Sequence, residues 1–205
     1  MKTKKLFKLK NYIYCISILF IFNHTKALAQ TFDAGVFLGI TASQISGDEL
    51  GGFHQPGIHF GGEVSTELNK VELGFGLAFN QKGSRATSKV TGPNQLYTLR
   101  LNYLDIPLFV RKTFNKWQVG LGPSINILAS AKEADVFGSK ELTVPFNTLD
   151  FTGVLQVGYY IKKKVLIRLS YGSSLIPVRK FNGNGTSFND GQYNEWLSTG
   201  VCFKL

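Results

Sequence analysis

The sequence predicts an all-β fold: an eight-stranded antiparallel up-and-down transmembrane β-barrel. The first observation is alternation. In "VELGFGLAFNQ" (71–81), large apolar residues occupy every second position, which is the period of a strand. The second is that the seven connections between eight such segments differ systematically in length. The third is that the apolar positions carry no charge, as a lipid-facing surface requires, since a cation at mid-bilayer costs about 2–4 kcal/mol.

The N-terminus resembles a secretory signal peptide. Five lysines precede a short apolar core (12–22), and "ALA" (27–29) provides the small residues that a signal peptidase needs. A core of this length is too short to span ~30 Å of hydrocarbon. We therefore predict a signal peptide over residues 1–29, an outer membrane β-barrel domain over 30–205, and export to the cell outer membrane.

Composition excludes several classes of function. The predicted signal peptide carries six lysines and no acid, so its removal lowers the formal charge from +10 to +4, which is too weak and scattered to indicate nucleic acid as a partner. Cys202 is the one cysteine after residue 29, so no disulfide within the mature chain is expected. No later stretch approaches 18 consecutive apolar residues, which argues against transmembrane helices.

Eight segments alternate in this way along the chain. We predict strands at 32–42, 57–68, 71–81, about 96–112, 117–127, 150–161, 165–175 and 195–205. Three connections are tight and basic, around 69–70, 115–116 and 162–164. Four are long and rich in Gly, Ser, Asn or Asp, at roughly 43–56, 83–95, 130–147 and 177–191. Outer membrane barrels have this pattern of short periplasmic turns and longer external loops.

A soluble barrel would also alternate, but with its large side chains inward. That arrangement would crowd Leu73, Phe75 and Phe79 inside while glycines faced water. The membrane arrangement puts bulky residues on lipid and small ones in a narrow lumen. Burial of Phe75 and Leu121 in a central core would exclude it.

The strand at 96–112 changes parity. Leu99, Leu101 and Tyr103 share one parity, whereas Leu104, Ile106, Leu108 and Val110 share the other. Keeping both sets on lipid requires a β-bulge near Tyr103–Leu104. We then expect Arg100, Asn102 and Asp105 to point inward.

An eight-stranded barrel is just filled by its own side chains, so a solute channel is not expected. Charged residues at inward positions predict a structural polar network in the lumen, because isolated buried charges are costly. Its predicted members are Glu63, Glu72, Arg100, Asp105 and Arg168. We predict no catalytic, cofactor or metal residues. His59, Glu63 and Ser65 share a strand face, but along an extended strand Glu63 and Ser65 lie roughly 13 Å and 20 Å from His59, too far to form one triad.

The chain ends in alternating apolar residues, Val201, Phe203 and Leu205. This ending resembles the signal by which the outer membrane assembly machinery receives barrels. We therefore expect that machinery to be a partner during insertion.

Several blocks resemble the PorT family of outer membrane β-barrel proteins of Bacteroidota. They are "GITASQISGDE", "PGIHFGGEV", "ELGFGLAFNQKGSR", "LNYLDIPLFVRK" and "VGLGPSINIL", and the run Tyr103–Leu108 and the pair Gly122–Pro123 are the most distinctive parts. The resemblance implies location and architecture. The family's namesake acts in type IX secretion.

Together these observations predict a small integral outer membrane protein with a structural or binding role in the cell envelope. It would be neither an enzyme nor a solute channel. One alternative is an accessory component of a type IX-like secretion complex or an uptake complex, and a second is a lipid-modifying enzyme. The expected partners are outer membrane lipids, the assembly machinery, and envelope or secretion-complex proteins.

Overall fold

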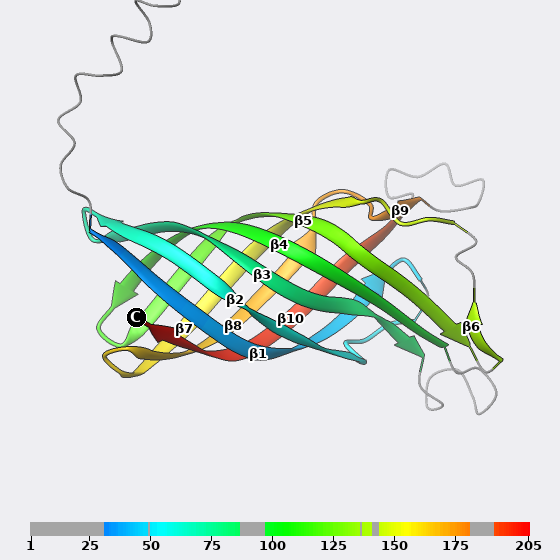
Figure 1. Ribbon diagram of the computed structural model, residues 1–205, viewed down its shortest axis with the longest axis horizontal. Coiled ribbons are helices and arrows are strands. Elements are labelled where there is room, and N and C mark those ends of the chain that lie inside the picture. The colour runs from blue at the N-terminus through cyan, green and yellow to red at the C-terminus, as the bar shows by residue number, and fades with distance from the viewer. Residues whose placement is uncertain (1–30, 49, 87–96, 136, 141–143, 181–190) are drawn as a thin grey trace, which may run out of the picture. The chain divides into compact units, whose positions relative to one another are not determined.

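The protein folds into a barrel of long antiparallel strands, which confirms the predicted fold class (Figure 1). The computed structural model describes residues 31–48, 50–86, 97–135, 137–140, 144–180 and 191–205. The predicted signal peptide, residues 1–29, lies outside the described residues. Among those residues, no helix is long and apolar enough to cross a membrane.

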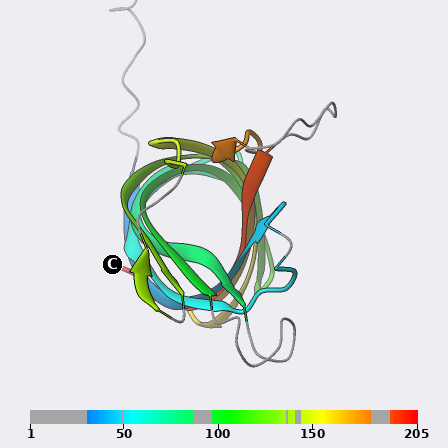
Figure 2. The same cartoon turned by 90° about the vertical axis from the view of Figure 1, so that its right-hand side faces the viewer.

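Eight strands form one sheet in chain order. They are β1 (Phe32–Ser46), β2 (Gln55–Leu68), β3 (Val71–Ala86), β4 (Tyr97–Phe114), β5 (Trp117–Asp135), β7 (Leu149–Lys162), β8 (Val165–Ser174) and β10 (Gly191–Lys204). Antiparallel pairing of β10 with β1 closes the sheet into a ring (Figure 2). Two short strands, β6 (Gly138–Lys140) and β9 (Arg179–Lys180), pair with β5 and β10 at one end of the barrel.

The two ends of the barrel differ as the connection lengths predict. Tight turns join β2 to β3, β4 to β5 and β7 to β8 at the end where β10 finishes (Figure 1). Asn69 and Lys70 both have positive φ, 51° and 67°, the backbone of the type I′ turn whose twist matches that of the flanking strands. The short strands β6 and β9 lie at the opposite end, where the strands joined by the longer connections meet those connections.

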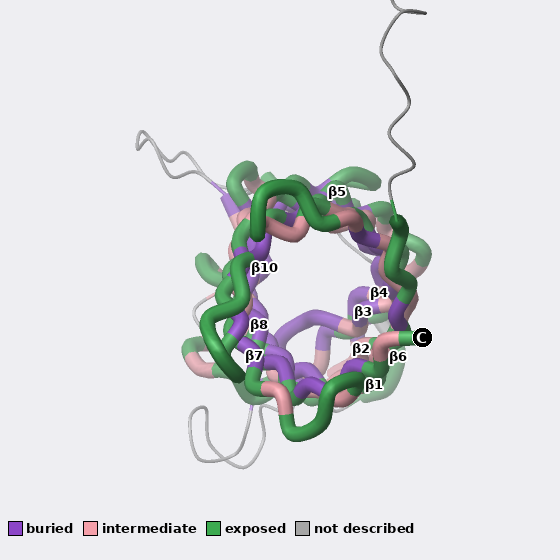
Figure 3. The backbone as a smooth tube through the Cα atoms, turned by 90° about the vertical axis from the view of Figure 1, so that its left-hand side faces the viewer, coloured by how far each residue is buried: buried purple, intermediate pink, exposed green. Residues whose placement is uncertain are grey.

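The outer wall carries a broad band of large apolar side chains, which we call the apolar belt. Phe75 and Leu121 are 55% and 59% exposed, so the soluble arrangement is excluded. Buried and exposed residues alternate along the strands (Figure 3). The belt is formed by Val36, Leu38, Ile40, Ile58, Phe60, Leu73, Phe75, Leu77, Leu104, Leu108, Val110, Val119, Leu121, Ile125, Ile127, Leu149, Phe151, Leu155, Val157, Ile167, Leu169 and Leu197. Such a surface is stable against acyl chains and not against water.

The β-bulge predicted in β4 is wrong, because the extra residue lies in the neighbouring strand β5. β4 alternates without a break: Leu99, Leu101, Tyr103 and Asp105 are all buried. The register shift lies in the pairing of β4 with β5, where Asn102 pairs with Ser130 and Tyr103 pairs with Leu128. The extra residue is therefore Ala129, in β5.

The parity change in β4 has a physical cause other than a bulge. The strands continue past the apolar belt at the long-loop end, so their outer face there lies beyond the hydrocarbon, in a polar medium. Apolar residues then gain free energy by facing the lumen, and polar residues by facing outward. Leu99 and Leu101 are fully enclosed, whereas Arg100 is exposed. The expectation that Arg100 and Asn102 point inward is therefore wrong, and only Asp105 of that trio lies inside.

Candidate functional site in the barrel lumen

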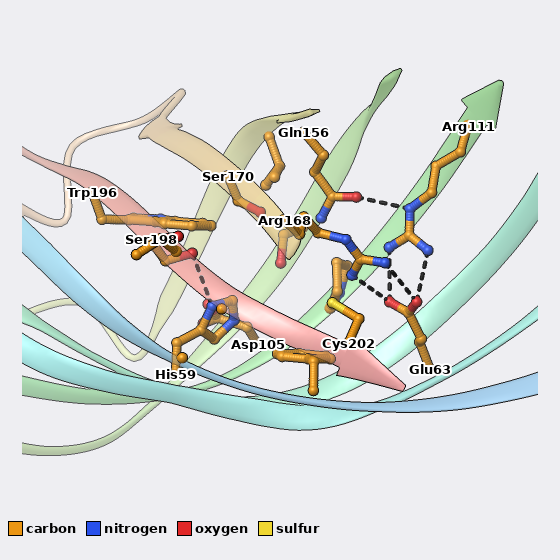
Figure 4. Close-up of a pocket in the computed structure, with 17 residues that line it drawn as sticks. His59, Glu63, Asp105, Arg111, Gln156, Arg168, Ser170, Trp196, Ser198 and Cys202 are labelled. Carbon is orange, nitrogen blue, oxygen red and sulfur yellow. Dashed lines mark hydrogen bonds and ion pairs between the residues drawn. The ribbon is translucent and has the colours of Figure 1, made fainter. Parts of the chain in front are cut away.

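Two arginines converge on one carboxylate in the half of the lumen nearer the short turns (Figure 4). Glu63 of β2 accepts two hydrogen bonds from Arg111 of β4, at 2.7 and 2.8 Å. It accepts two more from Arg168 of β8, both at 2.8 Å. Paired N–H donors matched to both carboxylate oxygens form the strongest class of protein ion pair. This arrangement ties three strands together across the lumen.

Neighbouring polar groups complete the arginine cluster. Arg111 also donates from Nε to Gln156 at 2.8 Å, and its guanidinium lies 3.4 Å from the ring centroid of Phe109. Closer to the short turns, Glu72 accepts hydrogen bonds from Gln118 at 3.1 Å and Lys204 at 3.3 Å. Arg111 reaches Glu72 as well, at 3.3 Å, so the two groups form a continuous network.

A second buried ion pair lies further toward the long loops. Lys82 of β3 is fully enclosed, and its ammonium lies 3.2 Å from both carboxylate oxygens of Asp105. Asn80 donates to the same carboxylate at 2.9 Å. The Lys82 ammonium also lies 4.7 Å from the ring centroid of Tyr103, a cation–π distance. The buried charge is thus paired and hydrogen-bonded, as a charge in a low-dielectric interior must be.

Next to the Lys82–Asp105 ion pair, the lumen contains a layer of side-chain amides and hydroxyls. Asp150 accepts hydrogen bonds from Asn194 at 3.0 Å and from Asn126 at 3.3 Å, and Asn126 donates to Thr152 at 2.6 Å. Asn194 also bonds the hydroxyl of Tyr103 at 3.2 Å. These contacts join β4, β5, β7 and β10 across the lumen.

The long-loop end of the lumen is filled by apolar side chains instead of a polar network. Two connections fold back into the mouth: Phe146 precedes β7 and Val178 precedes β9, and the amide of Asn147 donates to the carbonyl of Val178 at 2.7 Å. Both side chains are buried in one hydrophobic cluster, which consists of Ile45, Leu99, Leu101, Tyr103, Phe146 and Val178. This cluster packs side chains of β1, β4 and the two connections together at the long-loop end of the lumen.

Among the described residues, a small cavity lies in the middle of the lumen. It measures about 30 Å³ and lies between the arginine cluster and Trp196, which leaves space for a few water molecules. His59 Nδ1 lies 3.1 Å from the hydroxyl of Ser198, and its ring packs edge-on against Phe37 and Trp196. The pair is a serine–histidine contact, but the space beside it does not accommodate an acyl chain.

The described residues contain no group of three or more His, Cys, Asp or Glu side chains that could hold a metal ion. Cys202 is buried near the arginine cluster and lines the cavity.

Four of the five residues predicted for the polar network lie inside the barrel, and the structure connects three of them. Glu63, Glu72 and Arg168 belong to one hydrogen-bonded cluster, while Asp105 forms its own pair with Lys82. Arg100 is on the outer wall, because β4 has already left the apolar belt at that point.

Sequence reasoning missed two central residues, Arg111 and Lys82. Arg111 alternates with the outward-facing Leu108 and Val110, so the period alone would have placed it inward. Lys82 continues the inward series of Ala78 and Asn80, but the strand was predicted to end at residue 81. Lys82 was missed because the predicted strand stopped one residue short, whereas Arg111 lay within its predicted strand and its inward parity was not used.

Comparison with known protein families identifies the family of this barrel. Residues 28–179 match the family described as outer membrane protein beta-barrel domain. The chain belongs to this family. Barrels of the outer membrane generally present an apolar band to lipid, short turns to the periplasm and longer loops to the exterior, and we expect the same orientation here. Among curated proteins the sequence has no significant match.

Solved structures of outer membrane barrels resemble this barrel at low identity. Neisserial surface protein A is 12% identical, covering 85% of this chain and 97% of its own, with a TM-score of 0.48. Ail of Yersinia pestis is 13% identical, covering 85% and 99%, with a TM-score of 0.48. OprG of Pseudomonas aeruginosa is 11% identical, covering 86% and 97%, with a TM-score of 0.45.

Proposed function

We propose that this outer membrane barrel has a structural or binding role in the cell envelope, and that it neither conducts solutes nor catalyses a reaction. The observation that carries the proposal is the filled lumen. Ion pairs block its periplasmic half, the apolar cluster around Phe146 and Val178 blocks its external mouth, and the cavity between them holds about 30 Å³. A barrel without an open path acts through its surfaces.

We expect the purified barrel to be electrically silent. Reconstituted in planar phosphatidylcholine bilayers in 1 M KCl, the wild type should give no discrete conductance steps, because neither end of the lumen is open to ions. Phe146→Ala with Val178→Ala should stay silent too, since the arginine cluster still blocks the periplasmic half. Wild-type conductance steps, or liposome swelling in small sugars, would contradict the proposal.

A second candidate is an accessory subunit of a secretion complex. The resemblance of Tyr103–Leu108 and Gly122–Pro123 to the PorT family supports it. A structural feature also favours it: each of the three periplasmic turns carries an exposed lysine, namely Lys70, Lys116 and Lys163. These cations form a basic periplasmic rim that complements an acidic periplasmic protein surface.

This candidate predicts a charge-dependent partner. A tagged wild-type barrel, crosslinked in cells and purified in mild detergent, should retain an envelope protein that K70Q/K116Q/K163Q loses at least tenfold. The matched control is R85Q/R100Q/K132Q, which removes the same charge from the external end and should retain the partner. Purification of wild type without any stoichiometric protein would exclude the accessory role.

A further inference from the structure

Three cations gather on the outer wall of the barrel beyond the external edge of the apolar belt. Arg85 of β3, Arg100 of β4 and Lys132 of β5 are all exposed, on strands that lie side by side (Figure 1). Arg100 pairs directly with Lys132 across the β4–β5 ladder, and Arg85 pairs with Thr98, the outward neighbour of Arg100 two positions along β4. We call these three residues the external basic cluster.

Below this cluster, the outward-facing residues of β3, β4 and β5 form rows across the three strands, and the rows differ in polarity. The last apolar row is Phe79, Leu104 and Ile127. Two residues further out, Gln81 donates to Asn102 at 2.9 Å and Asn102 donates to Ser130 at 2.8 Å. Two residues beyond these come Arg100 and Lys132. The surface thus passes from hydrocarbon-like to hydrogen-bonding to cationic along each strand.

This order matches that of a lipid at the membrane surface. Four residues along a strand tilted by about 40° rise roughly 10 Å, which brings flexible Arg and Lys side chains within reach of a headgroup layer. The amides and the hydroxyl lie between, where a lipid has its polar linkages. A soluble anion would require only the cations and would not require them next to the apolar belt.

Within the part of the chain that the structure describes, no carboxylate neutralises the external basic cluster. None of the ion pairs among the described residues includes Arg85, Arg100 or Lys132. Like charges directly opposite each other in a sheet are destabilising, so the Arg100–Lys132 pair opposes folding unless an anion lies between them. A phosphate offers several acceptor oxygens and is bound well by Arg.

We propose that the external basic cluster binds the phosphate groups of an anionic lipid in the outer leaflet, whose acyl chains lie along the apolar belt beneath it. Arg100 and Lys132 form the centre of the site, and Arg85 contributes from its rim. The Gln81–Asn102–Ser130 row provides hydrogen-bonding groups for the lipid's linkage region. The site lies on the outer wall, so it does not depend on whether the lumen conducts.

Binding of purified diphosphoryl lipid A to the detergent-solubilised barrel, measured by native mass spectrometry, tests this proposal. Each basic side chain near an anionic lipid surface contributes about fivefold in affinity. R85Q/R100Q/K132Q should therefore bind about a hundredfold more weakly than wild type. Fully dephosphorylated lipid A should bind wild type and this variant equally.

The control variant K70Q/K116Q/K163Q loses the same charge from the periplasmic rim and should stay within about threefold of wild type. Heat-modifiable mobility on gels establishes that both variants are folded. Equal binding by R85Q/R100Q/K132Q and wild type would overturn the proposal, and so would an equal loss in the control. Complete displacement of lipid A by equimolar inorganic pyrophosphate would assign the cluster to a soluble anion instead.

Discussion

A chain that ends at Cys202 is expected not to reach the outer membrane. Removing Phe203, Lys204 and Leu205 deletes the end of the alternating apolar pattern that resembles an assembly signal. It also removes the last hydrogen bond at the closing seam, from the Leu205 amide to the carbonyl of Ala34, and one beside β8, from the Lys204 amide to the carbonyl of Lys164, each at 2.9 Å. The measurement is the amount of heat-modifiable protein in the outer membrane fraction, which should fall to background.

Two comparisons separate recognition of the ending from simple loss of stability. Phe203→Leu keeps an apolar side chain on the outer face and should assemble normally. The purified truncated chain should still refold in phosphatidylcholine vesicles, because most of the pairing between β1 and β10 is intact. Normal levels of the truncated barrel in the membrane would refute the role of this ending.

Glu63→Ala should cause the largest loss of stability of any single substitution in the lumen. The carboxylate is the shared partner of Arg111 and Arg168, which are 2% and 6% exposed. Removing it leaves two enclosed guanidinium groups without their main partner. Breaking one buried ion pair from one side costs about 3–5 kcal/mol. Urea unfolding in phosphatidylcholine vesicles, followed by tryptophan fluorescence, measures the change in free energy of unfolding.

The matched control for Glu63→Ala is Glu67→Ala, which removes an exposed carboxylate from the same strand and should change stability by less than about 0.5 kcal/mol. An unfolding curve of Glu63→Ala equal to that of wild type would show that the cluster contributes nothing to stability. Lipid analysis by mass spectrometry of cells carrying Glu63→Ala or His59→Gln should match wild type. A change in acylation with either variant would instead favour the lipid-modifying enzyme.

The strand pattern of the barrel could be predicted because it is a local property. Whether Phe75 faces lipid or the lumen depends on its parity relative to Glu72 and Gly74, and two-residue alternation carries that information within a single strand. Connection length then ordered the strands, since a tight turn joins neighbours. Of the predicted lumen network, Glu63, Glu72, Asp105 and Arg168 were found from the same parity.

The errors arose where the medium outside the barrel changes. Arg100 was placed inward because Leu99 and Leu101 were assumed to face lipid throughout. In the structure, β4 rises beyond the apolar belt, so its apolar residues pack with Phe146 and Val178 from two distant connections. No local pattern marks the height at which a strand leaves the hydrocarbon. Ala129 was missed for a similar reason, because a bulge is a relation between two strands.

By itself, the sequence determined that this chain alternates, that eight strands form its barrel wall, and that its apolar face meets lipid in the middle of the barrel. These properties depend on each residue and its near neighbours. Only the tertiary structure decided which charges meet. Arg111, Glu63 and Arg168 come from three strands, and their distances depend on barrel closure and stagger. Closure likewise brings Phe146 and Val178 into the mouth, because both lie on connections whose paths the pairing of the strands imposes.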